Sequence, residues 1–438
     1  MYLFSNFKKY QSQYFNFLIA LIPFSFIAGN LIINLNVILL IFSSLLIFKK
    51  KIFELKFYFL DKIIISFFLL VLFSGLINDI EFFFDKLSWK GYFSTFLKSL
   101  FFLRYLILYL CLRFLIEKQI VNIKQFFLFC SIATLFVCLD IFFQSIYGQD
   151  IFGFDSSASG RKLGGPFGDE LIAGGFIQRF FLFSFFLIPL FYKNQTRLLK
   201  YIIPVLFIIF LIGIILSGNR MPLIIFMFTI FLIVVFQKQT RKYFFPFLLI
   251  FSILFYLVFS FNSTVKDNFK SFYFQISDIA ITLISKDFDK SSPQYLKEFS
   301  TFYGTWTINK YIGGGIKNFR YYCHHRPNID KNSDFICNMH PHNYYLEILT
   351  EVGIIGFTLI IIIFFKVLHL SFFKKYLIKT RLNDNKTIIP FIFLFIAEIF
   401  PIKSTGSFFT TGNTTYLFLI LGILIALVRK NYSIENKT

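Results

Sequence analysis

The sequence predicts an all-α polytopic membrane protein with about 12 transmembrane helices and one large outer loop. Three observations support this fold class. First, 57% of the 438 residues are hydrophobic and only 15% are charged, with a mean hydropathy of +0.70. Second, apolar stretches of roughly 20 residues, long enough to cross a bilayer, recur along the chain. Third, Lys and Arg residues gather at alternate ends of these stretches.

Twelve spans fit this pattern. We expect them at residues 14–30, 31–48, 63–78, 100–116, 124–147, 171–192, 201–217, 219–236, 243–261, 352–370, 388–402 and 414–428. The first resembles a signal peptide, because Lys8 and Lys9 precede an apolar core, but it runs directly into the second span and is expected to be retained. The chain therefore divides into nine spans (1–261), a loop domain with short amphipathic helices (262–342) and three final spans (343–438).

The distribution of basic residues predicts the orientation. With the N-terminus in the cytoplasm, the seven inner segments hold 25 Lys and Arg residues, whereas the four short outer segments hold seven. The 262–342 loop is too long for this rule to apply. No other parity makes every inner segment basic, so both termini are expected in the cytoplasm and the loop outside. The same rule accounts for the net charge of +21, and no nucleic-acid partner is expected.

A motif with two histidines joins the outer loop to the tenth span. It reads HPHNYYLEILTEVGIIG and begins at His340. Pro341 keeps His340 out of helical geometry, and Asn343 is placed to cap the helix that follows. Gly353 and Gly356 would let a neighbouring helix approach closely. A titratable imidazole is thus held at one height above the bilayer, which indicates a functional site.

Other unusual residues fall on the same outer side of the predicted topology. They are Arg161 with the glycine-rich stretch 164–168, the sequence Ser217-Gly-Asn-Arg220, and the stretch 405–409. Four charged residues also lie in the outer parts of their spans: Arg104, Asp140, Arg179 and Glu398. Ions inside a membrane need a partner or a wet cavity. Structural pairs, Arg104–Asp140 or Arg179–Glu398, are one interpretation. A polar cavity open to the outside is the other, and the gathering of all four on one leaflet favours it.

The outer loop starts polar and charged. Residues 294–311 then predict an amphipathic helix at the membrane interface, with its apolar side formed by Tyr295, Phe299, Phe302, Trp306 and Ile308. Gly313, Gly314 and Gly315 indicate a turn or a close backbone approach. They lack the strand–loop–helix setting of a nucleotide-binding motif, so no nucleotide cofactor is expected.

The five cysteines fall into two groups. Cys111, Cys130 and Cys138 lie inside spans and are expected to act as small apolar residues. Cys323 and Cys337 lie in the outer loop, where an oxidising compartment favours a disulfide. A zinc site is the alternative, because four histidines are near in sequence: His324, His325, His340 and His342. The spacing fits no common zinc finger.

These residues resemble a known family. His342-Asn343, followed after nine residues by Gly353 and after two more by Gly356, resembles the signature loop of the bacterial O-antigen ligase and polymerase family. The stretch 217–220 is similar to the arginine-bearing short loop of that family. The stretches 164–168 and 406–409 are similar to its weaker outer-loop motifs, and Cys337-x-x-His340-Pro-His-Asn343 is similar to ligase-like members. The resemblance covers roughly residues 155–425.

The resemblance implies a membrane glycosyltransferase with the lipid-phosphate-sugar-dependent fold and with no metal or other cofactor. Such enzymes move a glycan from undecaprenyl diphosphate to an acceptor on the periplasmic face of the inner membrane. Ligases use lipid A–core as acceptor and polymerases use another lipid-linked repeat unit. We expect the ligase type, with the polymerase as alternative. A transporter of polysaccharide or lipid-linked oligosaccharide is the competing class, although the chain shows no internal repeat.

Site roles follow from the resemblance together with the chemistry. Arginine stays protonated and offers a bidentate fork, so Arg220 is expected to bind the diphosphate. An imidazole with an ordinary pKa of about 6.5 suits proton transfer near neutral pH, so His342 is expected to orient or deprotonate the acceptor. The alternative for His342 is a helix-start histidine bonded to backbone. Further substrate contacts are expected from Arg161, Arg320, His340, Asn343, Arg179 and Arg104. The helix starts that carry Arg220 and His342 are expected to face each other across one cavity.

Overall fold

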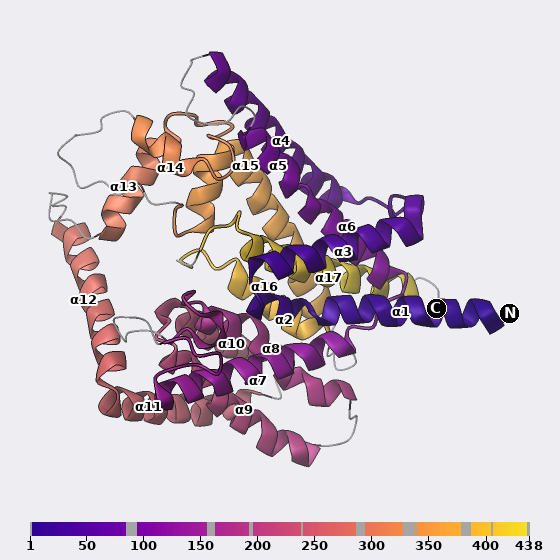
Figure 1. Cartoon of the computed structure of the whole chain (residues 1–438). Helices are drawn as coiled ribbons and strands as arrows, with labels where there is room; N and C mark the ends of the chain where they lie inside the picture. The colour runs from indigo at the N-terminus through magenta and orange to yellow at the C-terminus, as the bar shows by residue number, and fades with distance from the viewer. Residues whose placement is uncertain are drawn as a thin grey trace.

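The computed structural model describes residues 2–84, 94–155, 163–191, 196–237, 240–285, 294–326, 337, 340–377, 387–403 and 406–435. Within these ranges the regular structure is helical, apart from one isolated β-bridge between Gln149 and Asp155. The predicted all-α polytopic class is therefore confirmed. In Figure 1, α1 and α3 run across the view, whereas α4 and α5 run diagonally and α12 runs from top to bottom.

The helices follow the chain in this order. The first half contains α1 (Tyr2–Ala20), α2 (Ile22–Ile27), α3 (Asn30–Phe48), η1 (Lys49–Ile52), α4 (Phe59–Phe84), α5 (Ser94–Phe102), α6 (Arg104–Glu117), α7 (Lys124–Tyr147), η2 (Gly165–Phe167), α8 (Ala173–Phe191) and α9 (Thr196–Leu216). The second half contains α10 (Arg220–Phe236), η3 (Arg241–Tyr243), α11 (Phe244–Phe261), α12 (Ser263–Ser285), α13 (Gln294–Trp306), α14 (Phe319–Tyr322), η4 (Cys323–His325), α15 (Tyr344–Leu368), η5 (His369–Leu377), α16 (Ile388–Glu398) and α17 (Thr411–Glu435).

Seven helical stretches in the described ranges are long and apolar enough to cross a membrane. They are Asn30–Ile52, Phe59–Ile80, Ser94–Glu117, Lys124–Tyr147, Arg241–Phe261, Tyr344–Lys374 and Thr411–Lys430. Four shorter apolar helices are Ala173–Leu187, Tyr201–Leu216, Arg220–Phe236 and Ile388–Glu398. Together they overlap eleven of the twelve expected spans. The remaining span, 14–30, coincides with α1 and α2, which are separated at Leu21 just before Pro23. The exact number of crossings stays a prediction.

The last helix, α17, forms the centre of the bundle. It packs against α6 and α16, while α7 packs against α8 and α15 packs against α4. Residues 416–428 of α17 are buried without interruption on every face. A helix that is apolar all round is stable only inside a protein or a membrane. The final span is therefore enclosed by its neighbours and has little direct exposure to lipid.

Both chain ends lie at one end of the bundle, and α12, α13 and α14 lie at the other (Figure 1). Which side of the membrane each end faces stays a prediction. Buried charges occur at both ends. At the end that holds the termini, Asp61 forms ion pairs with Arg113 (2.8 Å) and Arg429 (3.0 Å), which join α4, α6 and α17. Buried charges are therefore not confined to the four residues that the sequence singled out.

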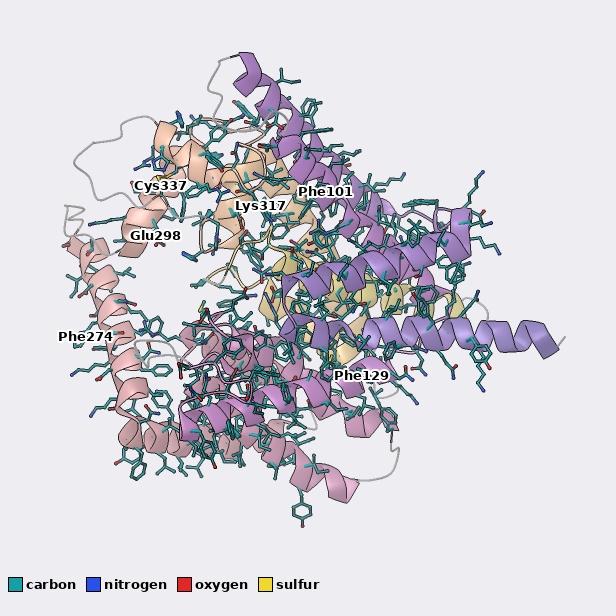
Figure 2. All side chains as sticks on the ribbon, in the orientation of Figure 1. Phe101, Phe129, Phe274, Glu298, Lys317 and Cys337 are labelled. Atoms are coloured by element: carbon teal, nitrogen blue, oxygen red, sulfur yellow. A yellow bond between two sulfur atoms is a disulfide. The ribbon has the colours of Figure 1, made fainter. Side chains whose placement is uncertain are left out.

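The outer loop contains more helix than its sequence indicates. Residues 263–285 form α12, although the sequence at the start of the loop indicates only a polar and charged segment. The expected amphipathic helix at 294–311 is present as α13 but ends at Trp306. Phe302 of α13 packs with Phe319 and Cys323 in a small core, against which Cys337 is half-buried. Figure 2 shows Cys337 close to α13 and α14, at the edge of the molecule.

The loop segment 310–315 is built into a break in α15. Gly353 has φ 71° inside the helix, and a Cβ placed there would lie 2.1 Å from the carbonyl oxygen of Tyr311. The freed backbone groups pair with the segment: Ile354 N donates to Lys310 O (2.9 Å), and Gly315 N donates to Glu351 O (2.9 Å). Gly353 therefore accommodates a loop backbone. The expectation that it admits a neighbouring helix is wrong.

The same segment confirms the close approach expected of the three glycines. A Cβ at Gly313 would lie 2.4 Å from the Glu351 carbonyl carbon, and one at Gly315 would lie 2.4 Å from Thr95. Side chains of α4 complete the attachment, since Asn78 donates to the carbonyl of Gly313 (2.9 Å). The outer loop is thereby fastened to two membrane helices at once.

Candidate functional site

His342 is the exposed residue directly before α15. Asn343 is the N-cap of the helix: its Oδ1 accepts hydrogen bonds from the backbone N–H groups of Tyr345 (2.9 Å) and Leu346 (3.3 Å), as the sequence predicts. Pro341 is buried beneath the turn, while the imidazole of His342 remains exposed. The local sequence therefore presents this imidazole from a rigid, capped helix start.

His340 supports His342 from one side. The two rings lie edge to face with 5.0 Å between their centroids. Partial burial, with a smaller contribution from His342, lowers the pKa of His340 below its ordinary value. Protonation of His340 is therefore disfavoured.

A buried ionic cluster lies directly below the start of α15. Glu398 at the end of α16 pairs with Arg179 of α8, with 2.9 Å between Oε1 and Nη2, and this is one of the two pairs that the sequence suggested. Tyr344 donates to the same Glu398 oxygen (2.8 Å), and Arg179 also donates to Asn413 Oδ1 (2.6 Å). The residue that follows Asn343 is thus part of a network that joins α8, α15, α16 and α17.

Lys403 completes the cluster, and sequence reasoning missed it. Its Nζ lies 2.6 Å from Glu398 Oε2 and 5.2 Å from the ring centroid of Tyr344, and the residue is 5% exposed. Burial lowers the pKa of Lys403 to about 8, with Glu398 opposing the shift and Arg179 adding to it. The signal in the sequence was weak: Lys403 is the single basic residue of the short outer segment 401–413.

The second suggested ion pair, Arg104–Asp140, is wrong. Arg104 donates to the hydroxyl of Tyr105 (2.7 Å) and to the carbonyl of Phe101 (3.0 Å), and it stacks on the Tyr105 ring. Asp140 is buried and accepts from the backbone N–H of Ile151 (2.8 Å). Each therefore bonds to residues close to it in the sequence, and Arg104 Nε and Asp140 Oδ2 are buried without a hydrogen-bond partner.

Arg220 is the first residue of α10 and is held by α12. Its Nε and Nη2 donate to Asn268 Oδ1, with 2.8 Å from Nε. Nη2 also donates to Ser271 Oγ (2.7 Å), and Nη1 donates to Gln275 Oε1 (3.1 Å). These hydrogen bonds from α12 orient the guanidinium fork.

The structure does not bring Arg220 and His342 into contact with each other. They are connected only indirectly, through packed helices. Helix α10 packs against α16, and Phe228 of α10 contacts Phe400 just after α16 (4.8 Å between centroids). Glu398 of α16 then binds Tyr344. A cavity shared by the two residues therefore stays a prediction.

The remaining candidates are placed as follows. Arg320 is exposed on α14 and stacks on Tyr321 (4.9 Å). The amide of Asn343 is engaged at both ends, since its Nδ2 donates to Pro401 O (2.7 Å), so Asn343 positions its neighbour His342. Arg161 lies outside the described residues.

The outer-loop cysteines are joined to each other. Cys323 and Cys337 form a disulfide with 5.8 Å between their Cα atoms, and Arg326 donates to both sulfur atoms (3.1 and 3.2 Å). The zinc alternative needs thiolates, which a disulfide does not supply. In the described part of the chain no three His, Cys, Asp or Glu side chains gather as a metal-binding group.

Comparison with known proteins agrees with these motifs. Residues 205–361 match the family described as O-antigen ligase. The match runs from α9 into α15, and it includes Arg220, the α12 residues that hold it, and His342. No curated protein matches the chain. Residues 205–361 of this multi-pass membrane protein are therefore similar to the O-antigen ligase family, in agreement with the resemblance that the motifs indicate.

Proposed function

We propose that the protein is an inner-membrane glycosyltransferase that moves a glycan from undecaprenyl diphosphate to lipid A–core on the periplasmic face. One observation carries the proposal. The exposed His342 stands at the capped start of α15. The buried cluster below this helix start contains two cationic side chains, Arg179 and Lys403, and one carboxylate, Glu398. A proton acceptor beside excess positive charge is the combination that transfer from a lipid diphosphate requires.

The reaction balances with these groups. The acceptor hydroxyl oxygen forms a bond to the anomeric carbon of the glycan while the bond from that carbon to the diphosphate oxygen breaks. The diphosphate leaves with the electron pair, and the hydroxyl proton passes to the imidazole of His342. An exposed histidine before a capped helix can take this proton without rearrangement of the backbone.

Arg220 would bind the diphosphate. It begins α10, where unpaired backbone N–H groups and the helix dipole favour an anion. Asn268 and Ser271 hold the fork in one orientation, which limits the loss of side-chain entropy on binding. A bidentate contact to the diphosphate would replace some of these side-chain acceptors. Lysine at this position would keep the charge and lose the fork.

The ionic cluster of Arg179, Lys403 and Glu398 below α15 would add to the electrostatic attraction of the diphosphate. Arg179 and Lys403 share the single Glu398 carboxylate, which leaves one positive charge in a buried setting. Electrostatic attraction in such a setting is stronger than at an exposed surface. Supporting contacts to the donor or acceptor are proposed for Arg104, Arg161, Arg320 and His340.

The test uses purified protein in nanodiscs with undecaprenyl-diphosphate glycan and lipid A–core, followed by gel and mass analysis. Wild type should produce glycan attached to lipid A–core, with or without a chelator. His342→Ala should bind the donor and fail to transfer, whereas Arg220→Lys should lose both affinity and rate. His324→Ala is the matched control, an exposed outer-loop histidine with no proposed role.

Each alternative gives a different result in this assay. Lengthened lipid-linked glycan in place of the lipid A–core conjugate would identify a polymerase. Translocated glycan without a new covalent product would identify a transporter. Activity that is lost to a chelator and restored by a metal ion would contradict the metal-free reaction.

A further inference from the structure

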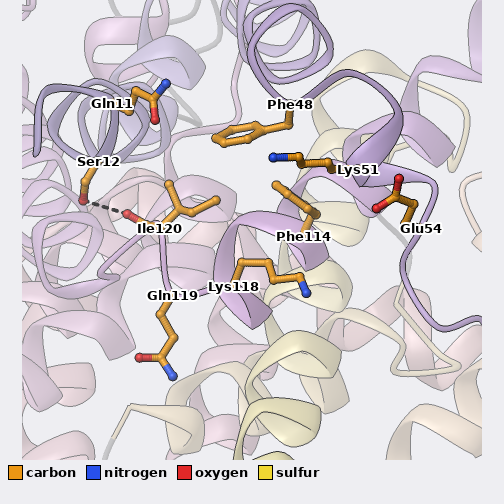
Figure 3. A pocket seen from close by; sticks show the side chains of 9 residues that line it. All are labelled: Gln11, Ser12, Phe48, Lys51, Glu54, Phe114, Lys118, Gln119 and Ile120. Atoms are coloured by element: carbon orange, nitrogen blue, oxygen red, sulfur yellow. Dashed lines mark hydrogen bonds between the residues drawn. The ribbon is translucent and has the colours of Figure 1, made fainter. Parts of the chain in front are cut away.

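A cavity of about 500 Å³ lies far from the histidine motif, at the end of the bundle that holds the chain termini. It is enclosed by α1, by the end of α3 with η1, and by the end of α6 with the loop that follows (Figure 3). Nothing in the proposed glycan transfer uses this cavity. The cavity is therefore a candidate for a second binding site.

The cavity is held open by packing that joins three helices. The rings of Phe48 and Phe114 contact each other with 5.0 Å between centroids, and Phe15 packs on the other side of Phe48 (5.6 Å). The Ser12 hydroxyl donates to the carbonyl of Ile120 (2.7 Å), which ties α1 to the opposite wall (Figure 3). The wall is therefore built from long-range contacts and does not depend on one loop.

The polar part of the lining is mainly cationic and donating. Lys51 and Lys118 contribute ammonium groups, and Gln11 and Gln119 contribute amides. Figure 3 shows the Lys51 amine directed toward Phe48 and Phe114. Glu54 is the single carboxylate of the lining. Two cations against one anion, with amide donors beside them, match an anionic group such as a phosphodiester.

The backbone supplies an independent observation. In the described residues only Lys49, Gln119 and Lys317 have positive φ without being glycine. Lys49 (φ 48°) ends α3 beside the cavity, and Gln119 (φ 58°) ends α6 with its side chain in the lining. Glycine is the usual residue at such helix ends, and a side chain there carries a conformational cost. Lys49 and Gln119 therefore place long polar side chains at two positions where the backbone would favour glycine.

The surroundings indicate where the anion comes from. Both α3 and α6 belong to stretches that can cross a membrane, and the cavity lies at their ends. Phe42 and Leu46, on other faces of α3 than Phe48, are more than half exposed, as expected of a helix that contacts lipid. A phosphate bound at these helix ends would lie at the height of the headgroups of lipids beside α3 and α6. A soluble phosphate compound would make no use of that position.

We propose that this cavity binds the headgroup of an anionic phospholipid of the cytoplasmic leaflet. Lys51 and Lys118 bind the phosphodiester, Gln119 donates to a headgroup oxygen, and Phe48 and Phe114 contact the glycerol and first methylene groups. The inference does not depend on the proposed glycan transfer. It assigns a lipid site to the inner end of a protein whose histidine motif lies at the outer end.

Native mass spectrometry of the full chain in detergent tests this site, with palmitoyl-oleoyl phosphatidylglycerol as probe and the corresponding phosphatidylcholine as the neutral lipid. Wild type should bind one phosphatidylglycerol with clear preference. Lys51→Gln/Lys118→Gln should weaken that first binding step by about 25-fold, since each lysine near a phosphate contributes about a fivefold factor. Lys242→Gln/Lys374→Gln changes the net charge equally outside the cavity and should leave binding unchanged.

Three results would overturn the proposal. Equal loss in both double variants would mean that the whole basic surface attracts lipid. Displacement of phosphatidylglycerol by excess inorganic phosphate would mean that the ligand is a soluble phosphate compound. Unchanged binding in Gln119→Gly, a substitution that relieves the strained helix end, would mean that the Gln119 side chain does not contact the headgroup.

Discussion

Asn343 donates a hydrogen bond from its side-chain amide to the carbonyl of Pro401, with 2.7 Å between nitrogen and oxygen. The bond joins the residue after His342 to the loop that carries Lys403. The proposed proton acceptor and the buried cation cluster are therefore positioned by one side chain that also caps α15. Rigid coupling of this kind is what a site needs if its two parts are to act on one substrate.

Substitutions at Asn343 should separate its two bonds. Asn343→Asp keeps the capping oxygen and loses the amide donor, whereas Asn343→Ala loses both. We expect Asn343→Ala to lower the unfolding free energy by about 1–2 kcal/mol and Asn343→Asp to cost less. Both should reduce transfer. Apparent melting in detergent together with the transfer assay measures this, and equal melting of all three proteins would contradict the capping role.

Glu398 should be essential for the fold and Lys403 should not. Glu398→Gln leaves Arg179 and Lys403 buried without a counter-charge and should destabilise by about 3–5 kcal/mol. Lys403→Met leaves a balanced Arg179–Glu398 pair, so stability should be kept while donor affinity falls. Folded yield and donor-binding titration distinguish the two. A Lys403→Met protein with wild-type donor affinity would remove the cluster from the site.

The lowered pKa of Lys403 predicts a dependence on pH. The folded protein has a pKa of about 8 for this group, against an ordinary value of 10.5, so the unfolded chain binds more protons between these values. Stability from this group should therefore rise as pH increases through that window. Donor binding should fall over the same range, because Lys403 loses its charge while Arg179 and Glu398 keep theirs. Lys403→Met should show neither trend.

Gly353 should be intolerant of any side chain. A Cβ would meet the Tyr311 carbonyl oxygen at 2.1 Å, and φ of 71° is unfavourable for other residues. Gly353→Ala should prevent correct docking of the outer loop and abolish monodisperse protein on size exclusion. Gly175→Ala is the matched control, because a Cβ there meets no atom within 4 Å. A well-folded Gly353→Ala protein would contradict the observed break in α15.

The Cys323–Cys337 disulfide should stabilise the small core of the outer loop. Replacing both cysteines by serine should cost roughly 3 kcal/mol, mainly through the entropy of the unfolded chain. Thiol labelling without reductant should modify none of the five cysteines in the folded protein, because Cys111, Cys130 and Cys138 are buried. Labelling of Cys323 and Cys337 in intact cells would show that they are reduced.

Hydropathy was sufficient to place the long apolar helices, because insertion into a bilayer depends on each segment's own composition. The number of crossings and their orientation stay predictions. The cap at Asn343 was equally predictable, since it involves residues only two and three positions apart. The outer-loop cysteine pair followed from compartment and spacing. The histidine and glycine spacing likewise led to the family, which the match to residues 205–361 confirms.

Long-range packing decided the rest. Gly353 accepts a loop backbone, Arg220 is held by a helix that begins more than 40 residues later in the chain, and Lys403 pairs beneath α15. The cavity at the end that holds the chain termini likewise combines three helices from separate parts of the sequence. No local sequence pattern predicts these contacts, because the partner that stabilises a buried ion or a break in a helix comes from a distant part of the chain. Local composition therefore sets which segments become helices, whereas tertiary contacts set which of their polar groups meet.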